Sequence, residues 1–581
     1  MRNRLLEVRN FFTRNTTRLF GIYLENFSNE LVGTGRLAIF LVTTRNRAQI
    51  AMHARVANPY FVPTHTFTNS RKHLRTSDAA RRIGALCVAL VLGSCSSQPA
   101  APSKQVIDTA LSQIEHVVVI YGENRSFDNL YGSFPGANGI AQASARSKTQ
   151  LDLDGRALPI LPPVWTGSDE EAEPAFGRGL PNGPFAIDEA PVNLPLSVPT
   201  RDLVHRYYQS IEQIDAGRND RFVAFSDAGA LTMGHYDGSK LTLWDLAREF
   251  TLADNFFMGT FGGSFMNHIW FACGCVARFP NAPEALKSKL GTDGKLQRRT
   301  DSPPSVLRGP IRWERDAALT PDGYAVNTIQ SSYQPSGIAP GVGADVRFAD
   351  RSKYPLPPID EPTIGDRLSD GGISWVWYAG GWNQALADSA LPGGTTRGVI
   401  YTNRPRSVDF QPHHQPYNYF RRYAPGTLLR QQHLKDGEQL LSDIEHNTLA
   451  QVSFYKPSGD FNEHSGYTDV ASGDAHIAQV IEKIRNSAAW PTTLIIVTYD
   501  ENGGYWDHVA PPSGEGWSDR WGPGTRIPAI LISPLVRKGF VDHTTYDTTS
   551  IHRLLTRRFG LQPLPSARPK MGDLTNALAL P

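Results

Sequence analysis

Several runs of β-branched and apolar residues along the chain stop abruptly at acidic or amide side chains. One run covers 114–120 and another covers 494–497. Apolar runs of this length indicate strands that are buried on both faces, as in a parallel sheet. The oxygen-bearing side chains that follow these runs are Glu123 and Asn124 after the first, and Asp500 and Glu501 after the second. Because ligands bind at the carboxyl ends of strands in open α/β sheets, we expect a site at this edge.

Segments with helical spacing and long irregular segments separate the strand-like runs. Residues 241–257 predict an amphipathic helix that leads into a strand. Asp474 is expected to cap a later helix at its N-terminus, and the alternative is that it supports a metal ligand by a hydrogen bond. Two stretches rich in Pro and Gly, 141–200 and 280–360, are interpreted as insertions. The pattern therefore predicts an α/β fold with a central, mostly parallel sheet flanked by helices and interrupted by long loop insertions.

Charge is distributed unevenly along the 581 residues. Of the 58 basic and 56 acidic residues, 14 and 4 precede Cys95, which leaves 44 and 52 in the remainder, a net charge of −8. No basic stripe supports contact with a phosphate backbone, so we expect no nucleic-acid partner. A hydrophobic content of 40% predicts that most of the chain is globular.

The N-terminal region differs from the rest of the chain in its hydrophobic pattern. Residues 1–75 show neither a sustained period nor clean helix caps and are expected to be a non-native or disordered extension. Arg81 and Arg82 then precede a short apolar run, 83–92, that is too short to span a bilayer and is typical of a signal peptide. The alternative is a short buried apolar helix.

Leu92-Gly93-Ser94-Cys95 resembles a bacterial lipobox, in which the cysteine is lipidated after cleavage. We therefore expect a signal and linker segment over 76–112 and a folded domain over 113–581. The resemblance implies an exported protein, either secreted, periplasmic or anchored to the outer membrane by a lipid on Cys95.

Three further positions carry candidate chemistry. Adjacent carboxylates at Asp500 and Glu501 repel each other unless a cation or proton lies between them, which favours a divalent metal over the alternative of a solvated acidic loop. Ser264 follows two glycines, so its hydroxyl is expected at an exposed tight turn; a purely structural turn is the alternative. Cys273 and Cys275 are spaced awkwardly for a disulfide and are interpreted as small core residues.

Two histidine positions complete the candidate set. His413 and His414 stand together between prolines, where neighbouring side chains point to different sides and at most one serves a site. His464 lies in a loop after a predicted strand and is either a surface residue or a proton donor, because histidine titrates near neutrality.

The string E-N-R-S-F-D-x-x-x-G from Glu123, together with TYDENGGYWDHVAPP, resembles the bacterial phosphoesterase family of acid phosphatases and phospholipases C. Similar segments run from Ile114 to Arg558. The resemblance implies an alkaline-phosphatase-like fold and a divalent metal whose ligands are Glu123, Asn124, Ser264, Asp500 and Glu501. It also implies substrate contacts from Asn267, His268 and His413, and catalytic roles for Ser264 as nucleophile, His414 at the phosphate and His464 as proton donor to the leaving oxygen.

Serine at position 264, rather than the threonine of the phospholipase members, favours the acid phosphatase branch. The expected reaction is hydrolysis of a phosphate monoester through a phosphoserine. The alternatives are a phospholipase C that hydrolyses lipid headgroup diesters, and a surface-binding lipoprotein that has lost catalysis.

Overall fold

Parallel pairing around one central strand organises the fold. In the computed structural model, which describes residues 103–167, 171–392, 395, 397–401, 408–565 and 568–580, β1 (His116–Gly122) pairs in parallel with β8 (Val452–Lys456) on one side and β9 (Thr493–Tyr499) on the other. All seven residues of β9 are buried, as expected for a strand covered on both faces. The predictions for 1–75 and for the signal segment with Cys95 lie outside the described residues.

The main sheet has eight strands in the order β11-β4-β10-β9-β1-β8-β6-β7. Only β10 runs antiparallel to its neighbours, β4 and β9, so the expected mostly parallel sheet is confirmed. Its remaining strands are β4 (Thr251–Ala253), β6 (Trp375–Ala379), β7 (Leu434–Asp436), β10 (Ala529–Ile532) and β11 (Phe540–Asp542). Two short pairs stand apart from it: β2 (Phe185–Ala186) with β3 (Gly234–His235), and β5 (Phe256–Phe257) with β12 (Tyr546–Asp547).

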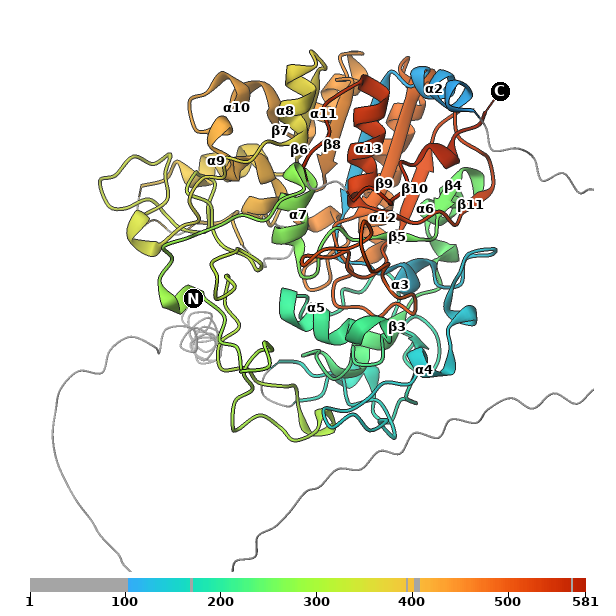
Figure 1. The fold of residues 1–581 in the computed structure, drawn as a ribbon, viewed down its shortest axis with the longest axis vertical. Coiled ribbons are helices and arrows are strands. Elements are labelled where there is room, and N and C mark those ends of the chain that lie inside the picture. The colour runs from blue at the N-terminus through green and yellow to red at the C-terminus, as the bar shows by residue number, and fades with distance from the viewer. Residues whose placement is uncertain are drawn as a thin grey trace, which may run out of the picture. The chain divides into compact units, whose positions relative to one another are not determined.

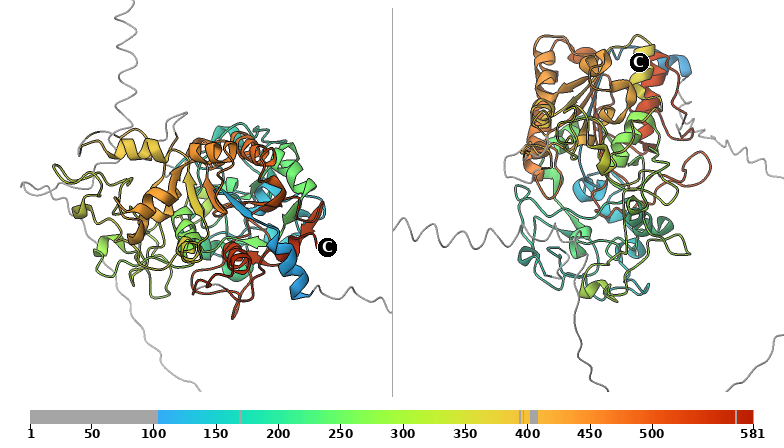
Figure 2. Two further views of the ribbon diagram at one scale, coloured as in Figure 1. Left: turned by 90° about the horizontal axis from the view of Figure 1, so that it is seen from above. Right: turned by 90° about the vertical axis from the view of Figure 1, so that its left-hand side faces the viewer.

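Helices lie on both sides of the sheet, as the view from above shows (Figure 2). Helix α12 contacts both α6 and α11, while α7 contacts α8, and α13 contacts α2. The helices are α2 (Lys104–Ser112), α3 (Phe127–Tyr131), α4 (Ala145–Lys148), α5 (Tyr207–Ile214), α6 (Thr242–Glu249), α7 (Ser264–Cys273), α8 (Ile364–Asp370), α9 (Trp382–Ser389), α10 (Leu428–His433), α11 (Gly437–Glu445), α12 (Val470–Arg485) and α13 (Thr548–Phe559). The predicted α/β class is confirmed.

The two predicted insertions contain little regular structure and lie beyond the carboxyl ends of the parallel strands (Figure 1). Their backbone is held largely by isolated bridges, such as the one between Leu319 and Ala325. The insertions therefore cover the sheet edge at which the sequence predicts the site. Among the described residues, no helix is both long enough and apolar enough to cross a membrane.

Three local expectations were wrong. Residues 104–112, expected to be linker, form α2, because Ser103 caps the helix and Asp108 pairs with Arg557 of α13 at 2.8 Å. Cys273 and Cys275 form a disulfide, which their spacing did not predict: Gly274 has a φ of +58° at the end of α7 and turns the chain, so the two Cα atoms lie 5.1 Å apart. The prediction that they pack in the core holds for Cys273, and Cys275 packs against the core.

The third concerns Asp474, which lies inside α12 and does not cap it. Its carboxylate accepts the backbone N–H groups of Thr242 and Leu243 at 2.8 and 2.9 Å, so it caps α6 instead. Asp469 is the residue that caps α12. A contact between two helices that are distant in sequence has no local signal, which explains the error.

Candidate active site

Three segments meet at the carboxyl end of the sheet. Gly122 of β1 lies opposite Tyr499 of β9, so the loops that follow these parallel strands begin side by side. The Oγ atom of Ser264, the first residue of α7, lies 3.2 Å from Oδ1 of Asn124 and 3.4 Å from Oε1 of Glu501. The structure thus joins the predicted serine to residues of both predicted loops.

A second contact holds the two loops together. The backbone N–H of Asn124 donates to Oδ1 of Asp500 at 3.1 Å. Asn124 adopts a φ of +65°, a left-handed conformation that asparagine tolerates better than most residues. Asparagine therefore suits the backbone conformation at this position, and its amide side chain contacts Ser264.

Glycines allow the loops to approach one another. A Cβ atom on Gly503, whose φ is +60°, would lie 2.4 Å from the carbonyl oxygen of Asn124. A Cβ atom on Gly263 would lie 2.6 Å from the carbonyl oxygen of His205. The G-G pairs of the sequence thus serve close packing between loops as well as turns.

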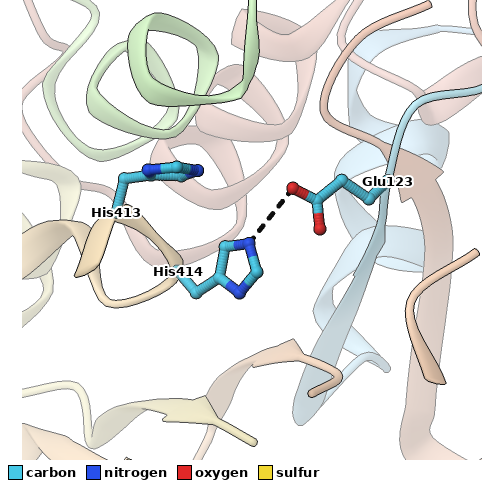
Figure 3. A group of neighbouring side chains, drawn as sticks. All are labelled: Glu123, His413 and His414. Carbon is cyan, nitrogen blue, oxygen red and sulfur yellow. Dashed lines mark hydrogen bonds and ion pairs between the residues drawn. The ribbon is translucent and has the colours of Figure 1, made fainter. Parts of the chain in front are cut away.

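Glu123 forms a separate buried network beside this group (Figure 3). Its Oε1 lies 3.1 Å from Nε2 of His414, and its Oε2 lies 3.1 Å from Nζ of Lys456 and accepts the side-chain amide of Asn462. Burial by itself raises the pKa of Glu123, but the charges on His414 and Lys456 outweigh burial and hold the pKa well below its usual range. Glu123 is therefore an anion that this network compensates.

Burial makes it unfavourable for the other two carboxylates, Asp500 and Glu501, to ionise without a compensating positive charge. Burial raises the pKa of Asp500 to about 6 and raises that of Glu501 well above its usual range. His205 lies with Nε2 3.6 Å from Oε1 of Glu501; burial disfavours its charge, but Glu501 and Asp202 outweigh burial and raise its pKa to about 9. The site therefore favours positive charge next to Glu501.

The donor set fits a hard divalent cation. Oδ2 of Asp500 is buried and has no hydrogen-bond partner, which leaves one carboxylate oxygen available. The atoms around Ser264 Oγ are amide and carboxylate oxygens, which suit cations such as Mg²⁺, Ca²⁺ or Mn²⁺. Asn124, Ser264, Asp500 and Glu501 are thus joined by direct contacts, whereas the carboxylate of Glu123 contacts His414, Lys456 and Asn462.

A cavity of about 770 Å³ opens over Ser264. His205, His413 and His464 line it together with Asp202. Both ring nitrogens of His413 are buried without a hydrogen-bond partner, and Nδ1 of His464 contacts the carbonyl oxygen of Ser465, which leaves Nε2 as its other polar atom. Imidazoles at the wall of a cavity can bind a phosphoryl oxygen or transfer a proton.

The other predicted substrate contacts lie elsewhere. Asn267 uses its amide to hold the loop before α7, with Oδ1 accepting the N–H of Thr260 at 3.0 Å and Nδ2 donating to the carbonyl of Gly262 at 3.1 Å. His268 is fully buried, and its Nδ1 lies 2.8 Å from the carbonyl oxygen of Ser264. His414, expected at the phosphate, contacts Glu123, and its neighbour His413 lines the cavity in its place.

Sequence reasoning missed four residues near the site. Asp202, His205 and Lys456 were not singled out, and neither was Asn462. Lys456 ends β8, the parallel neighbour of β1, so its position at the strand end was an available signal. His205 and Asp202 reach the site from the segment that follows the 141–200 insertion, and no local pattern marks them.

A further acidic cluster near the DENGG loop is satisfied internally. Arg526 contacts Asp507 and Asp128, each at 3.1 Å, and Nδ1 of His508 lies 2.7 Å from Asp128. Because the guanidinium already compensates both carboxylates, Asp507 and His508 support the loop and do not extend the site.

Sequence comparison finds relatives over most of the chain. Non-hemolytic phospholipase C of Burkholderia pseudomallei is 24% identical over 547 residues, which cover 88% of this chain and 65% of that enzyme. Phospholipase C A of Mycobacterium tuberculosis is 24% identical over 80% of this chain and 77% of its own length. The chain thus spans just under two thirds of the Burkholderia enzyme.

Structural similarity to solved proteins is low. A protein in the alkaline phosphatase superfamily from Vibrio parahaemolyticus has a TM-score of 0.29 and 12% identity, with 68% of this chain and 76% of that chain covered. A sulfatase from Pseudoalteromonas has a TM-score of 0.30 and 11% identity over 82% of this chain and 77% of that chain. The sequence profile of the phosphoesterase family, by contrast, matches residues 114–562. The chain belongs to the phosphoesterase family.

Proposed function

We propose that this protein hydrolyses phosphate monoesters through a phosphoserine formed at Ser264. The observation that carries the proposal is the position of the Ser264 hydroxyl, which lines the cavity and contacts both Asn124 and Glu501. Ser264 is also the first residue of α7, a helix of 10 residues, and the N-terminus of a helix favours a phosphate group.

In this proposal Asn124, Ser264, Asp500 and Glu501 hold a divalent cation, with Glu123 as a further ligand or as the anion that positions Asn124. A bound cation would lower the pKa of the serine hydroxyl and offset negative charge on the phosphoryl oxygens. Glu501 accepts a hydrogen bond from the hydroxyl at 3.4 Å, and in this proposal it takes up the hydroxyl proton when Oγ attacks phosphorus.

The chemical steps balance with groups present in the chain. Ser264 Oγ forms a bond to phosphorus and passes its hydroxyl proton to Glu501, while the bond between phosphorus and the leaving oxygen breaks. His464 supplies the proton that the leaving oxygen needs, and His205 and His413 hold the phosphoryl oxygens. Water then attacks the phosphoserine and gives a proton back to His464, while Ser264 Oγ leaves phosphorus and regains its proton from Glu501, which releases phosphate and the free serine. Because burial lowers the pKa of His464, its acid form increases below neutrality, which favours an acidic optimum.

A phosphodiesterase reaction on lipid headgroups is the second candidate. The two relatives described above are named phospholipases C, and this observation favours the alternative. The same serine, cation ligands and histidines serve either substrate, so the choice depends on the walls of the cavity.

Hydrolysis of a chromogenic monoester and of a phosphocholine diester, measured between pH 4 and pH 9 with and without chelator, tests the proposal. We expect faster turnover of the monoester, a maximum below neutrality and loss of activity with chelator. Preference for the diester selects the phospholipase C alternative. Absence of turnover on both substrates, with the cation present, contradicts both and favours a binding lipoprotein.

We also propose export, with a lipid on Cys95 that attaches the protein to a membrane. The support is the sequence 92–95 and the preceding basic and apolar residues. The intact mass of the native protein tests this: a mature chain that begins at a lipidated Cys95 is expected, and a mass that includes residues 1–75 contradicts it.

A further inference from the structure

The turn that carries His464 has a backbone conformation that needs support. Glu463, the residue before His464, adopts a φ of +73°, in the left-handed region that is costly for a residue with a Cβ atom. Its side chain is buried, and a Cβ atom on Gly473 of α12 would lie 2.3 Å from its Cγ. Strained conformations of this kind persist only where several contacts fix them, and they cluster at functional sites. The contacts around this turn therefore bear on the function of His464.

Two side chains fix Glu463 in this conformation. Nε and Nη2 of Arg125 donate to its backbone carbonyl at 3.1 and 2.6 Å. The hydroxyl of Tyr499 donates to its Oε2 at 2.8 Å. Both contacts act on residue 463, so the position of the next residue depends on its own contacts.

Asn462 connects His464 to Glu123. Oδ1 of Asn462 accepts the backbone N–H of His464 at 3.0 Å, and Nδ2 of the same amide donates to Oε2 of Glu123. The backbone carbonyl of Asn462 also accepts the N–H of Glu123 at 2.9 Å. Asn462 is fully buried, which shields these hydrogen bonds from competition with water. One side chain thus bridges the loop after β8 and the loop after β1.

The ring of His464 is oriented by the residues that follow it. Nδ1 contacts the carbonyl oxygen of Ser465, which requires a hydrogen on Nδ1 and leaves Nε2 to exchange a proton with a ligand. The ring also stacks on that of Tyr467, with centroids 4.0 Å apart and an interplanar angle of 17°. Because all three residues belong to one turn, a shift of the backbone at His464 moves Nε2 within the cavity that the ring lines.

We infer that Asn462 is a positioning residue that holds His464, the proton donor of the proposed reaction, at the leaving oxygen. The inference rests on the proposed function and adds a buried residue that acts through the backbone of His464. Proton donation matters most when the leaving group is an alkoxide, because a nitrophenolate leaves readily without a proton. Loss of the Asn462 amide should therefore slow the hydrolysis of alkyl esters selectively.

Hydrolysis of butyl phosphate and of nitrophenyl phosphate by the full chain measures this selectivity. We expect Asn462→Ala to lower kcat/KM about 100-fold for the butyl ester and less than about fivefold for the nitrophenyl ester. His464→Gln should show the same selectivity, and the double variant should be no more selective than His464→Gln alone. Asn182→Ala is the matched control, because its amide makes three hydrogen bonds to the backbone of residues 150 and 158 of the insertion, and it should leave the ratio unchanged.

An unchanged ratio of the two kcat/KM values in Asn462→Ala, or a further selective loss in the double variant, overturns the inference and leaves hydrolysis at Ser264 intact. Asn462→Ser, which leaves room for a water beside Glu123, replaces Asn462→Ala if the alanine variant does not fold. Failure of both variants to fold assigns Asn462 a structural role and also overturns the inference.

Turnover of neither ester by the wild type is a failure of the proposed function, and a second measurement then decides the inference on its own. Hydrogen exchange of the Nδ1–H of His464 is followed by NMR, with the signal assigned by its absence from the spectrum of His464→Gln. Exchange that is roughly tenfold faster in the folded Asn462 variant than in the wild type supports the positioning role. Equal exchange in the two proteins overturns it.

Discussion

At the scale of single residues, Lys456 is a positive partner of the buried carboxylate of Glu123. Both side chains are fully buried, and their charged atoms lie 3.1 Å apart. Lys456 also lies over the ring of Tyr121. No local motif marks Lys456, because its role depends on the neighbouring strand β1.

Replacement Lys456→Met leaves the carboxylate of Glu123 buried with His414 and Asn462 alone. Breaking a buried ion pair by removing one partner costs about 3 to 5 kcal/mol, and we expect a loss of that size in the free energy of unfolding, measured with urea. Lys483→Met is the matched control, because Lys483 pairs with Glu445 at the exposed surface at 3.0 Å and should cost less than about 1 kcal/mol. Equal losses in the two variants would contradict this account of Glu123.

The positions most readily predicted from sequence are those of residues that follow strands directly. Asn124, Asp500 and Glu501 could be assigned to one edge because apolar runs locate strand ends, and the resemblance to the family added Ser264. His413 and His414 could not be separated, because their orientations are set by packing of the turn 412–414 against α7 and Glu123. His205 was missed because the irregular segment between the 141–200 insertion and α5 has no hydrophobic period.

At the scale of elements, loops that contain glycine determine how the strand ends meet. The loop after β9 approaches the loop after β1 so closely at Gly503 that no side chain fits there. Substitution of Gly503 should be destabilising for two reasons, namely its left-handed φ and its contact with the backbone of Asn124. Gly560, which has a left-handed φ but no such contact, provides the comparison.

Gly503→Ala is expected to lower the free energy of unfolding by about 3 kcal/mol, from the left-handed backbone and from overpacking. Activity should also fall, because the displaced segment carries Asn124. Gly560→Ala, at a φ of +66° with no atom within 4 Å, should cost only about 1 to 2 kcal/mol and leave kcat unchanged. Thermal or urea unfolding and steady-state kinetics of both variants measure these effects. Matching behaviour of the two variants would show that the loop contact is unimportant.

The elements themselves were largely predictable, and their long-range connections were not. The apolar runs located β1 and β9, and the amphipathic pattern located α6 and the following strand β4. The strand order could not be read from the chain, because it arises from pairing between distant segments. Helix α2 was missed because its stabilising partner, Arg557, lies 449 residues away.

At the scale of the whole molecule, buried histidines couple stability to pH. Burial lowers the pKa of His552, which lies in α13, to about 4, and its Nε2 lies 2.7 Å from the carbonyl oxygen of Phe271. The unfolded chain, with a pKa near 6.5, binds a proton at higher pH than the folded chain does. This contribution to stability is therefore full above pH 6.5 and falls as pH decreases to 4, by about 3 kcal/mol in total.

Urea unfolding at pH 7 and pH 5 measures this effect. We expect His552→Gln, whose amide can still donate to the carbonyl of Phe271, to lose about 2 kcal/mol less than the wild type between the two pH values. His446→Gln, at an exposed position, should lose as much as the wild type. If His552→Gln has the same pH dependence as the wild type, His552 is not the source of acid sensitivity.

The central claim is that Ser264 carries the phosphoryl group during turnover. Acid quenching of the protein during turnover of a monoester, followed by mass spectrometry of the peptide that contains Ser264, tests it directly. The account predicts one phosphoryl group on Ser264 in the wild type, and neither phosphorylation nor turnover in a folded Ser264→Ala variant. Turnover by Ser264→Ala, or turnover by the wild type with the phosphoryl group on another residue, would contradict the account.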